Sequence, residues 1–530
     1  MTTTYINARM PGTRNDAFVV EDGRFRAVGK KARILNQDTD LIIDLKDQAV
    51  LPGFHDAHLH LLGLGKMMDM IDVKRARSIS ELIEMLKVEQ KPVILGRGYD
   101  ESQFKERRSP HKADLDQVSH TKPVLLYRFC SHVMIANQVA IDQAYALHGD
   151  YPSDKDQYDL QTGRFTETSR KWLMALEPEK KSDLRRFILN GQNHLLKHGV
   201  TSVGSDDFGV VSTDYESVLD VFSLLGESGR LKLRVLEQVN IADEEQFKDF
   251  IKKDYPHKAY GRFRIGPVKL LLDGSLGART AAMREPYTDA PDETGLLVYD
   301  EPFIRRRLDL ARTKRMDFAM HAIGDRTIET LIRVKETREE EDARDAIIHA
   351  QLADHAQIER MRALSLGAQV QPAFIGSDAP IVHDRLGNRV PSTYLFNTMI
   401  TAGVPTAFST DAPIEDVNPL HTIYTAMTRQ SVHGSQPFNA EEAVPFKDAL
   451  HAYTAAPAYF ARSEHMLGAI KKNHQADFVV VKGLAFDDPE TLKTAKVVET
   501  YIDGSCVYSA RKPNREKTDP ADKDDALYLL

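Results

Sequence analysis

Residues 51–60 read LPGFHDAHLH, a short apolar run that ends in two histidines. Side chains of an extended strand alternate between two faces, so His58 and His60 share one face and can hold a single metal ion, whereas His55 lies on the other face. The chain contains 19 histidines, so a lone pair of this kind also fits an ordinary surface pair. The stretch indicates a metal site only if other segments bring coordinating residues to the same place.

Apolar runs like this one recur along the chain and alternate with longer amphipathic stretches, which is typical of repeated strand–helix units around a parallel sheet. The candidate strands are residues 49–60, 200–205, 231–239, 266–274, 316–324, 346–351, 367–374 and 404–412. Eight strands close a (β/α)8 TIM barrel, so we predict an α/β barrel over residues 51–463. That span exceeds the roughly 250 residues typical of the fold, and an insertion at about residues 65–190 is expected to account for the excess.

Both ends of the chain show a different pattern, in which short strands are separated by turns. Asp22-Gly23 and Asp503-Gly504 each lie between runs rich in β-branched and aromatic residues, as in β-hairpins. We expect residues 1–50 and 464–515 to pair into one small composite β-sandwich, because each piece is too short to bury a core alone. The charge-dense residues 516–530 are expected to form a C-terminal tail.

The composition excludes several classes of protein. Of the 530 residues, 42% are hydrophobic and 28% are charged, which excludes a disordered, collagen-like or disulfide-stapled chain. The net charge of −8 comes without basic blocks, so no nucleic-acid partner is expected. There is neither a basic–apolar leader nor a run of 18 apolar residues, and the two cysteines fit free thiols. We therefore expect no membrane span and a cytoplasmic location.

Coordinating side chains come at the ends of several other candidate strands, where the chemistry of a barrel is placed. His321 ends the fifth strand, His349 the sixth, and Asp411 the eighth. Taken singly, either histidine also fits a structural role and Asp411 fits a helix N-cap. An acid directly after a buried run is costly, however, unless it meets a cation or good hydrogen bonds.

The fourth candidate strand carries Lys269 among apolar neighbours, in VKLLLDGS. Burial disfavours the charged ammonium and lowers its pKa. A neutral amine can react with carbon dioxide, and the resulting carbamate is a carboxylate on a long arm that is suited to bridging two divalent metals. The alternative is an ion pair between Lys269 and a neighbouring acid such as Asp273.

Taken together, the segments that carry these residues resemble the amidohydrolase superfamily, and within it the YtcJ-like branch related to N-substituted formamide deformylases. The matching stretches are LPGFHDAHLH, VKLLLDGSLGARTA, HAIGDRTIE, HAQ, STDAPIEDVNP and HQADFVVV. They span almost the whole chain.

The resemblance implies a role for each coordinating residue. His58 and His60 would bind the more buried metal, His321 and His349 the second metal, and Lys269 would bridge them as its carbamate. Asp411 would bind the first metal and act as the base. The implied cofactors are two divalent ions, with zinc favoured by imidazole and carboxylate ligands, and carbon dioxide as the carbamate. Without carbamylation of Lys269, a one-metal site remains an alternative.

The implied function is hydrolysis of a non-peptide carbon–nitrogen bond, in an amide or formamide of a small molecule, by a metal-activated water. The alternatives are a deaminase or another ester or amide hydrolase on the same metal centre, and, outside catalysis, a silent scaffold of the same fold. The resemblance favours a homodimer.

Four residues are candidates for substrate binding. Tyr99 and Asp100, in GRGYDESQF, and His132, in YRFCSHVMIAN, match family stretches, although Cys130 replaces the acid that many relatives have two positions before this histidine. Arg279, in GSLGART, can meet a substrate carboxylate through a bidentate fork, or it can form an ordinary ion pair.

Overall fold

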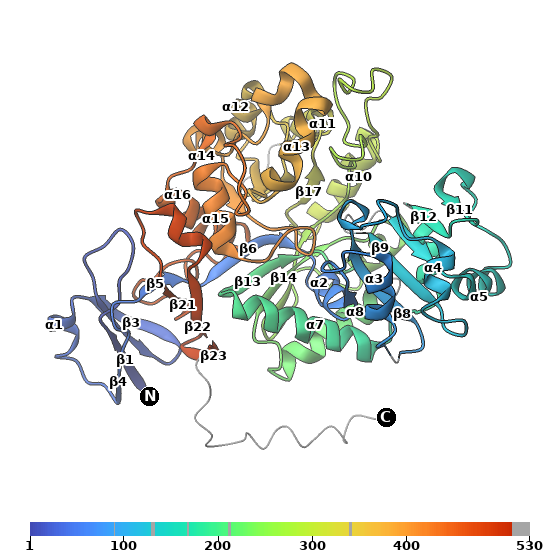
Figure 1. Ribbon diagram of the computed structural model, residues 1–530. Coiled ribbons are helices and arrows are strands. Elements are labelled where there is room, and N and C mark those ends of the chain that lie inside the picture. Colours follow the sequence, from blue (N-terminus) through green and yellow to red (C-terminus); the bar gives the residue numbers. More distant parts are fainter. Residues whose placement is uncertain (90, 129–132, 167–168, 210–213, 339–341, 511–530) are drawn as a thin grey trace.

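The computed structural model describes residues 1–89, 91–128, 133–166, 169–209, 214–338 and 342–510. His132 and the expected tail at 516–530 lie outside these residues. Figure 1 shows central parallel strands with a sheet from the chain ends on one side and an inserted sheet on the other. Among the described residues, no helix is both long and apolar enough to cross a membrane.

Each of the eight segments predicted as strands overlaps a parallel strand, although β16 begins three residues before its predicted segment and ends at Val268. These are β6 (Phe54–Leu59), β13 (Val200–Ser205), β14 (Arg234–Val239), β16 (Phe263–Val268), β17 (Ala319–Ala322), β18 (Ala346–His349), β19 (Gly367–Val370) and β20 (Thr406–Phe408). The first four form one sheet in the order β6-β13-β14-β16, with the short antiparallel strand β15 (Ala259–Tyr260) beside β16. The last four form a second sheet in the order β17-β18-β19-β20.

Backbone contacts connect the two sheets on both sides. Isolated parallel bridges join Val268 to Phe318 and Leu271 to His321, between the segments of β16 and β17. On the other side, Asp411 N–H donates to the His58 carbonyl over 2.9 Å and His60 N–H donates to the Ala412 carbonyl over 2.8 Å. The strands follow one another in the order of a TIM-barrel-like α/β fold.

Helices alternate with these strands. They are α7 (Lys181–Lys197), α8 (Tyr215–Glu227), α9 (Glu244–Lys252), α10 (Glu301–Arg312), α11 (Asp325–Glu336), α12 (His355–Ala363), α13 (Phe374–Leu386), α14 (Phe396–Ala402), α15 (Pro419–Thr428), α16 (Phe446–Ala452) and α17 (Ala455–Phe460). Several begin at an aspartate: Asp243, Asp300 and Asp354 each accept a 2.8 Å hydrogen bond from the backbone N–H three residues on. Such caps satisfy helix donors that lack an intrahelical acceptor.

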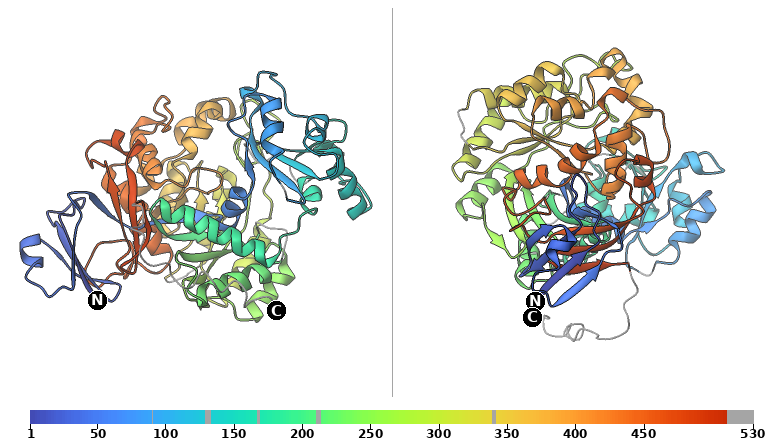
Figure 2. Two further views of the ribbon diagram at one scale, coloured as in Figure 1. Left: turned by 60° about the horizontal axis from the view of Figure 1, so that its bottom comes forward. Right: turned by 90° about the vertical axis from the view of Figure 1, so that its left-hand side faces the viewer.

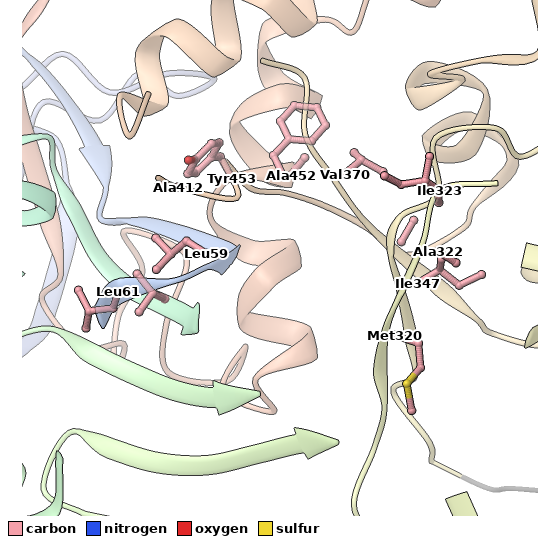
Figure 3. Close-up of a cluster of buried hydrophobic side chains, with 14 of the residues drawn as sticks. Leu59, Leu61, Met320, Ala322, Ile323, Ile347, Val370, Ala412, Ala452 and Tyr453 are labelled. Atoms are coloured by element: carbon pink, nitrogen blue, oxygen red, sulfur yellow. The ribbon is translucent and has the colours of Figure 1, made fainter. Parts of the chain in front are cut away.

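The main hydrophobic core lies among these strands and helices. Figure 3 shows part of it, with Leu59 of β6, Met320 of β17 and Ile347 of β18, all fully buried. Apolar side chains from successive strands thus fill the interior, and polar residues that follow them are carried to the ends of the strands.

Strands from the two chain ends lie side by side (Figure 2). One four-stranded sheet contains β1 (Thr2–Ile6), β2 (Ala17–Glu21), β3 (Arg24–Gly29) and β4 (Leu41–Asp44), with the short helix α1 (Lys31–Ile34). A second contains β5 (Ala49–Pro52), β21 (Phe478–Lys482), β22 (Lys496–Ile502) and β23 (Ser505–Ser509). Both contribute to one aromatic cluster, in which the ring of Phe478 lies 5.0 Å from that of Phe18 and 4.3 Å from that of Tyr501.

The segment between β6 and β13 contains a six-stranded sheet of its own, in the order β11-β12-β10-β9-β8-β7. The strands are β7 (Ile71–Asp72), β8 (Ile94–Tyr99), β9 (Val124–Arg128), β10 (Val133–Ala136), β11 (Tyr158–Asp159) and β12 (Arg164–Thr166), and the helices are α2 (Leu61–Met68), α3 (Ile79–Leu86), α4 (Lys112–Asp116), α5 (Gln138–His148) and α6 (Arg170–Met174). No strand was predicted from the sequence within this insertion. In Figure 1 this sheet lies on the side toward which β6, β13 and β14 point.

Candidate metal centre

His58, His60 and Asp411 converge where β6 and β20 end. Oδ1 of Asp411 lies 3.3 Å from Nε2 of His58 and 3.1 Å from Nε2 of His60. One potential ligand atom from each of the three residues lies within 4.8 Å of the other two. The backbone hydrogen bonds between the two segments hold the carboxylate opposite the histidine pair. The spacing of two residues in HLH therefore brings both imidazoles to one ion-sized space.

The proton of each imidazole is assigned by what its Nδ1 contacts. Nδ1 of His58 lies 2.6 Å from Oε1 of Gln238, and Nδ1 of His60 lies 2.8 Å from the Asp206 carbonyl. The orientation of the Gln238 amide is set because its nitrogen donates to the Ala57 carbonyl over 3.0 Å and to Gln369 Oε1 over 3.2 Å. Both Nδ1 atoms thus face acceptors and carry hydrogen, which leaves a lone pair on each Nε2.

This arrangement fits a cation. With both imidazoles neutral, the Nε2 lone pairs of His58 and His60 each lie within 3.3 Å of Asp411 Oδ1, which is buried and has no hydrogen-bond donor among the described residues. Buried acceptors that meet without a donor repel one another unless a proton or a metal lies between them. Neutral imidazole nitrogens with a carboxylate form a donor set that suits zinc.

Burial and close contact shift the pKa values of His58, His60 and Asp411. Burial and the nearby Lys269 ammonium lower the pKa of His58 to about 4. Burial also opposes the charge on His60, but its contact with Asp411 and the charge of Asp206 outweigh burial and raise its pKa to about 9. Burial would raise the pKa of Asp411, yet the two histidines hold it well below the usual range. A cation would take the place of the proton that His60 otherwise retains.

Lys269 follows β16 and reaches the same group. Its Nζ lies 3.3 Å from Nε2 of His58 and 3.6 Å from Oδ2 of Asp206, and the residue is 1% exposed. Burial lowers the pKa of its amine despite Asp206 and Asp411 nearby. The acid beside Lys269 is therefore Asp206 and not Asp273, the partner considered from the sequence. Asp273 instead accepts backbone hydrogen bonds from Ile323 and Gly324.

His321 and His349 lie together next to this group. Their ring centroids are 4.4 Å apart, and the ring of His349 is 6.1 Å from that of His58. Nδ1 of His349 contacts Gln371 Oε1 at 2.8 Å, whereas Nε2 of His321 contacts two acceptors, the Gly274 carbonyl at 3.1 Å and Asp273 Oδ1 at 3.2 Å. Nε2 of His349 and Nδ1 of His321 are thus the nitrogens left as ligand atoms. Burial, with His321 beside it, holds the pKa of His349 well below its usual value.

Two of these residues have strained backbones. His349 has φ of 76° and Asp411 has φ of 55°, in the left-handed region that side chains other than glycine rarely adopt. Strain of this kind clusters at functional sites, where the surrounding structure holds it in place. His349 is the last residue of β18, and Asp411 lies three residues after the end of β20.

Tyr99 and Asp100 lie in the inserted sheet and the turn after it. Tyr99 ends β8, is fully buried, and its hydroxyl lies 3.1 Å from that of Ser109. Asp100 caps the following turn by accepting a hydrogen bond from Ser102 N–H over 3.0 Å. Their contact with a substrate stays a prediction, as does that of His132, which lies outside the described residues.

Arg279 forms an ion pair. Its Nε and a terminal nitrogen donate to the two carboxylate oxygens of Asp289 over 3.0 and 2.8 Å, and Arg385 shares the same acid. The bidentate fork considered for a substrate carboxylate is therefore occupied by Asp289. Its role in substrate binding stays a prediction that would require this pair to open.

Sequence reasoning missed the residues that orient the histidines. Gln238 and Gln371 accept from His58 and His349, and both are at least 98% buried. A glutamine at or directly after an apolar strand was the available signal, since burying an amide is costly unless every hydrogen bond is made. Second-layer partners of this kind fix the tautomer and orientation of metal-binding histidines.

The chain is similar to known proteins along most of its length. The sequence pattern of the Amidohydrolase family matches residues 41–508. YtcJ of Bacillus subtilis, an amidohydrolase by name, is 30% identical over 94% of this chain and 96% of its own. N-substituted formamide deformylase of Arthrobacter pascens is 23% identical over 95% of this chain and 97% of its own.

Two solved structures are similar along nearly their whole length. An uncharacterized metal-dependent hydrolase of Pyrococcus horikoshii has 30% identity and a TM-score of 0.79, covering 92% of this chain and 98% of its own. One of Pyrococcus furiosus has 31% identity and a TM-score of 0.78, covering 92% and 100%.

Proposed function

The chain belongs to the amidohydrolase family and is a metal-dependent hydrolase, and we propose that it cleaves the carbon–nitrogen bond of an amide or formamide in a small molecule. The observation that carries the proposal is the meeting of two Nε2 lone pairs with Asp411 Oδ1, next to a second histidine pair. The match to a formamide deformylase supports the choice of bond.

In this proposal the site holds two divalent ions, with zinc favoured by the donor set. His58, His60 and Asp411 would hold the first, and His321 and His349 would hold the second. Bound there, the ions would supply a water of lowered pKa and a Lewis acid for the substrate carbonyl. On each of the four histidines, the nitrogen assigned here is the one opposite the nitrogen that contacts a carbonyl or amide oxygen.

As a carbamate, Lys269 would supply a carboxylate ligand to the ions. Burial favours its neutral amine, which adds to carbon dioxide through a new N–C bond and releases a proton. Its Nζ lies 3.3 Å from His58 Nε2, and this position next to the histidine pair supports the role.

Asp411 handles the proton of the reaction. Its low pKa keeps the carboxylate ionised at neutral pH, so it can accept a proton from the attacking water. The same proton then passes to the leaving nitrogen as the C–N bond breaks, and the carboxylate is regenerated. The other residues orient the substrate: Tyr99, Asp100, His132 and Arg279 belong to the proposal in this role.

The domain division is part of the same proposal. A barrel over residues 51–463, with the insertion at about 65–190, carries the site, and a composite β-sandwich of residues 1–50 and 464–515 packs beside it. The shared cluster of Phe18, Phe478 and Tyr501 supports the pairing of the two ends.

The test is turnover by the zinc- and bicarbonate-loaded chain on a panel of N-formyl amines, N-acyl amines, esters and amino-heterocycles. We expect the amides or formamides to be cleaved fastest, and Asp411→Asn to lose turnover about a hundredfold or more while keeping its fold by circular dichroism. Asp416→Asn is the matched control, since it removes a carboxylate from the same loop that pairs with His421. Faster release of ammonia from the amino-heterocycles would indicate a deaminase, and a folded, metal-free, inert protein would indicate a scaffold.

A further inference from the structure

A hollow lies at the opposite ends of the strands from the metal centre. It contains about 600 Å³, open solvent at its mouth included, and is lined by the first residues of β14 and β16, by β6 and β13, and by the segment after α17. His55 lies three residues before His58 along β6, which separates the two places by about 10 Å. The hollow is therefore distinct from the site of the proposed reaction.

Three arginines line this hollow, and two of them are neutralised. Arg234 donates to Asp477 over 2.9 Å and also pairs with Asp503, and Arg262 pairs with Asp503 at 2.6 Å. These contacts connect the β14 and β16 segments to the C-terminal sheet. Both acids are therefore already paired with arginines.

The third arginine, Arg264, has no acidic partner among the described residues. Arg264 is half-buried, and among the described residues its hydrogen-bond partner is the backbone carbonyl of Ala461, directly after α17. Burial alone lowers the pKa of its guanidinium, with no carboxylate acting against it. A guanidinium has five N–H donors, so one carbonyl leaves most of them unused. A cation taken partly out of water without a counter-ion is costly, and structures normally offset that cost with an anion.

Two further polar side chains line the hollow with spare hydrogen-bonding capacity. His55 is 4% exposed, and its Nδ1 is buried with no hydrogen-bond partner. Ser202 is also 4% exposed, and the described residues show no hydrogen bond from its hydroxyl. Burial and the charges of Arg264 and Arg234 lower the pKa of His55 to about 3, so the ring is neutral and can donate one hydrogen bond.

We propose that this hollow binds a small oxyanion, a phosphate or carboxylate group, held by Arg264 with His55 and Ser202. The planar fork of arginine matches the two oxygens of such a group, and a hydroxyl and an imidazole N–H complete its shell. Arg234 and Arg262 are held in ion pairs with Asp477 and Asp503, so they do not compete for the ligand. Because the anion binds the folded strands of the barrel, its binding stabilises the fold.

The test uses the metal-loaded full chain, with inorganic phosphate and malonate as separate probes at constant ionic strength. Calorimetric titration gives the affinity, and the melting temperature gives the stabilisation. In Arg264→Gln we expect about tenfold weaker binding and loss of the rise in melting temperature. Arg33→Gln, an exposed arginine of α1, is the matched control and should bind as the wild type does.

Phosphate also has affinity for metal ions, and the variants separate the two places. Binding at the metal centre would survive in Arg264→Gln, so unchanged affinity in that variant overturns the proposal, as does absence of binding to the wild type. Arg264→Lys keeps the charge without the fork and should bind with intermediate affinity, which gives a second reading if the glutamine variant does not fold. Tighter binding of phosphate than of malonate identifies a phosphorylated ligand, and the reverse order identifies a carboxylate.

Discussion

Oε1 of Gln238 lies 2.6 Å from Nδ1 of His58, and the amide nitrogen of Gln238 donates to the Ala57 carbonyl. Separate partners thus identify the oxygen and the nitrogen of the Gln238 amide. The oxygen accepts a hydrogen bond from Nδ1–H of His58, which fixes the imidazole hydrogen on Nδ1. Nε2 is left as a lone pair aimed at the place where His60 and Asp411 meet. A neutral, pre-oriented histidine is what a metal ion requires.

Replacement of Gln238 should therefore weaken metal binding without removing a ligand. In Gln238→Leu we expect the affinity for zinc to fall about 10- to 100-fold, the range found when such supporting partners are changed. Gln238→Glu keeps an oxygen for His58 and should recover part of the loss. Competition with a chromophoric chelator measures both affinities, and equal affinity in wild type and Gln238→Leu would show that the contact has no such role.

Replacement of Lys269 should be rescued by a small carboxylic acid, because the proposed carbamate is itself a carboxylate. Lys269→Ala should lose roughly a hundredfold or more in turnover and bind about one ion in place of two, since a bridging ligand is removed. Acetate or propionate added at high concentration should restore part of both by placing a carboxylate in the space that the side chain leaves. Metal analysis and turnover assays follow the rescue. Full activity of Lys269→Ala without any added acid would argue against a bridge.

The aromatic cluster between the two end sheets should contribute strongly to stability. Phe478 is fully buried and its ring lies within 6.0 Å of those of Tyr5, Phe18, Phe25 and Tyr501. Phe478→Ala should cost about 3–5 kcal/mol, and Phe478→Leu clearly less because most of the volume is kept. Thermal unfolding checks the order of the melting temperatures. A Phe478→Ala protein as stable as the wild type would mean that the two chain ends do not share a core.

Stability should depend on pH through His55. Its pKa in the folded protein is about 3, below the 6.5 of an unfolded histidine, because burial and the charges of Arg264 and Arg234 oppose protonation. Below pH 6.5 the unfolded chain binds a proton that the folded chain does not, so stability falls by up to about 1.4 kcal/mol for each pH unit until pH 3. His55→Gln lacks this loss.

The comparison of wild type with His55→Gln isolates this contribution from the other acids of the chain. Whatever the difference in melting temperature at pH 7, it should shift in favour of the variant at pH 5. Parallel curves for the two proteins between pH 7 and pH 5 would show that His55 protonates as easily in the folded as in the unfolded chain.

The central strands, and the meeting of the candidate ligand residues, could be predicted because both depend on local pattern. Each apolar run marks a buried strand, and a histidine, lysine or aspartate directly after it is carried to the carboxyl end by the strand itself. His58, His60, Lys269 and Asp411 accordingly lie together in the structure. The match to the Amidohydrolase family confirms the resemblance on which their roles were assigned.

Contacts between distant segments could not be predicted in this way. The short strands β11 and β12 of the inserted sheet pair antiparallel, and the runs involved are too short to show a period of two. The partners of Arg279 and Lys269, which are Asp289 and Asp206, were not predicted for the same reason. These side chains meet because segments distant in the sequence fold against one another. The residues next to them in the sequence give no signal of such a contact.

The most direct test of the metal centre is zinc-edge anomalous diffraction from crystals of the zinc- and bicarbonate-loaded protein. We predict one anomalous peak about 2.0–2.2 Å from Nε2 of His58, Nε2 of His60 and a carboxylate oxygen of Asp411, and a second beside His321 and His349. A fully zinc-loaded crystal with no peak next to His58 and His60 would contradict the account.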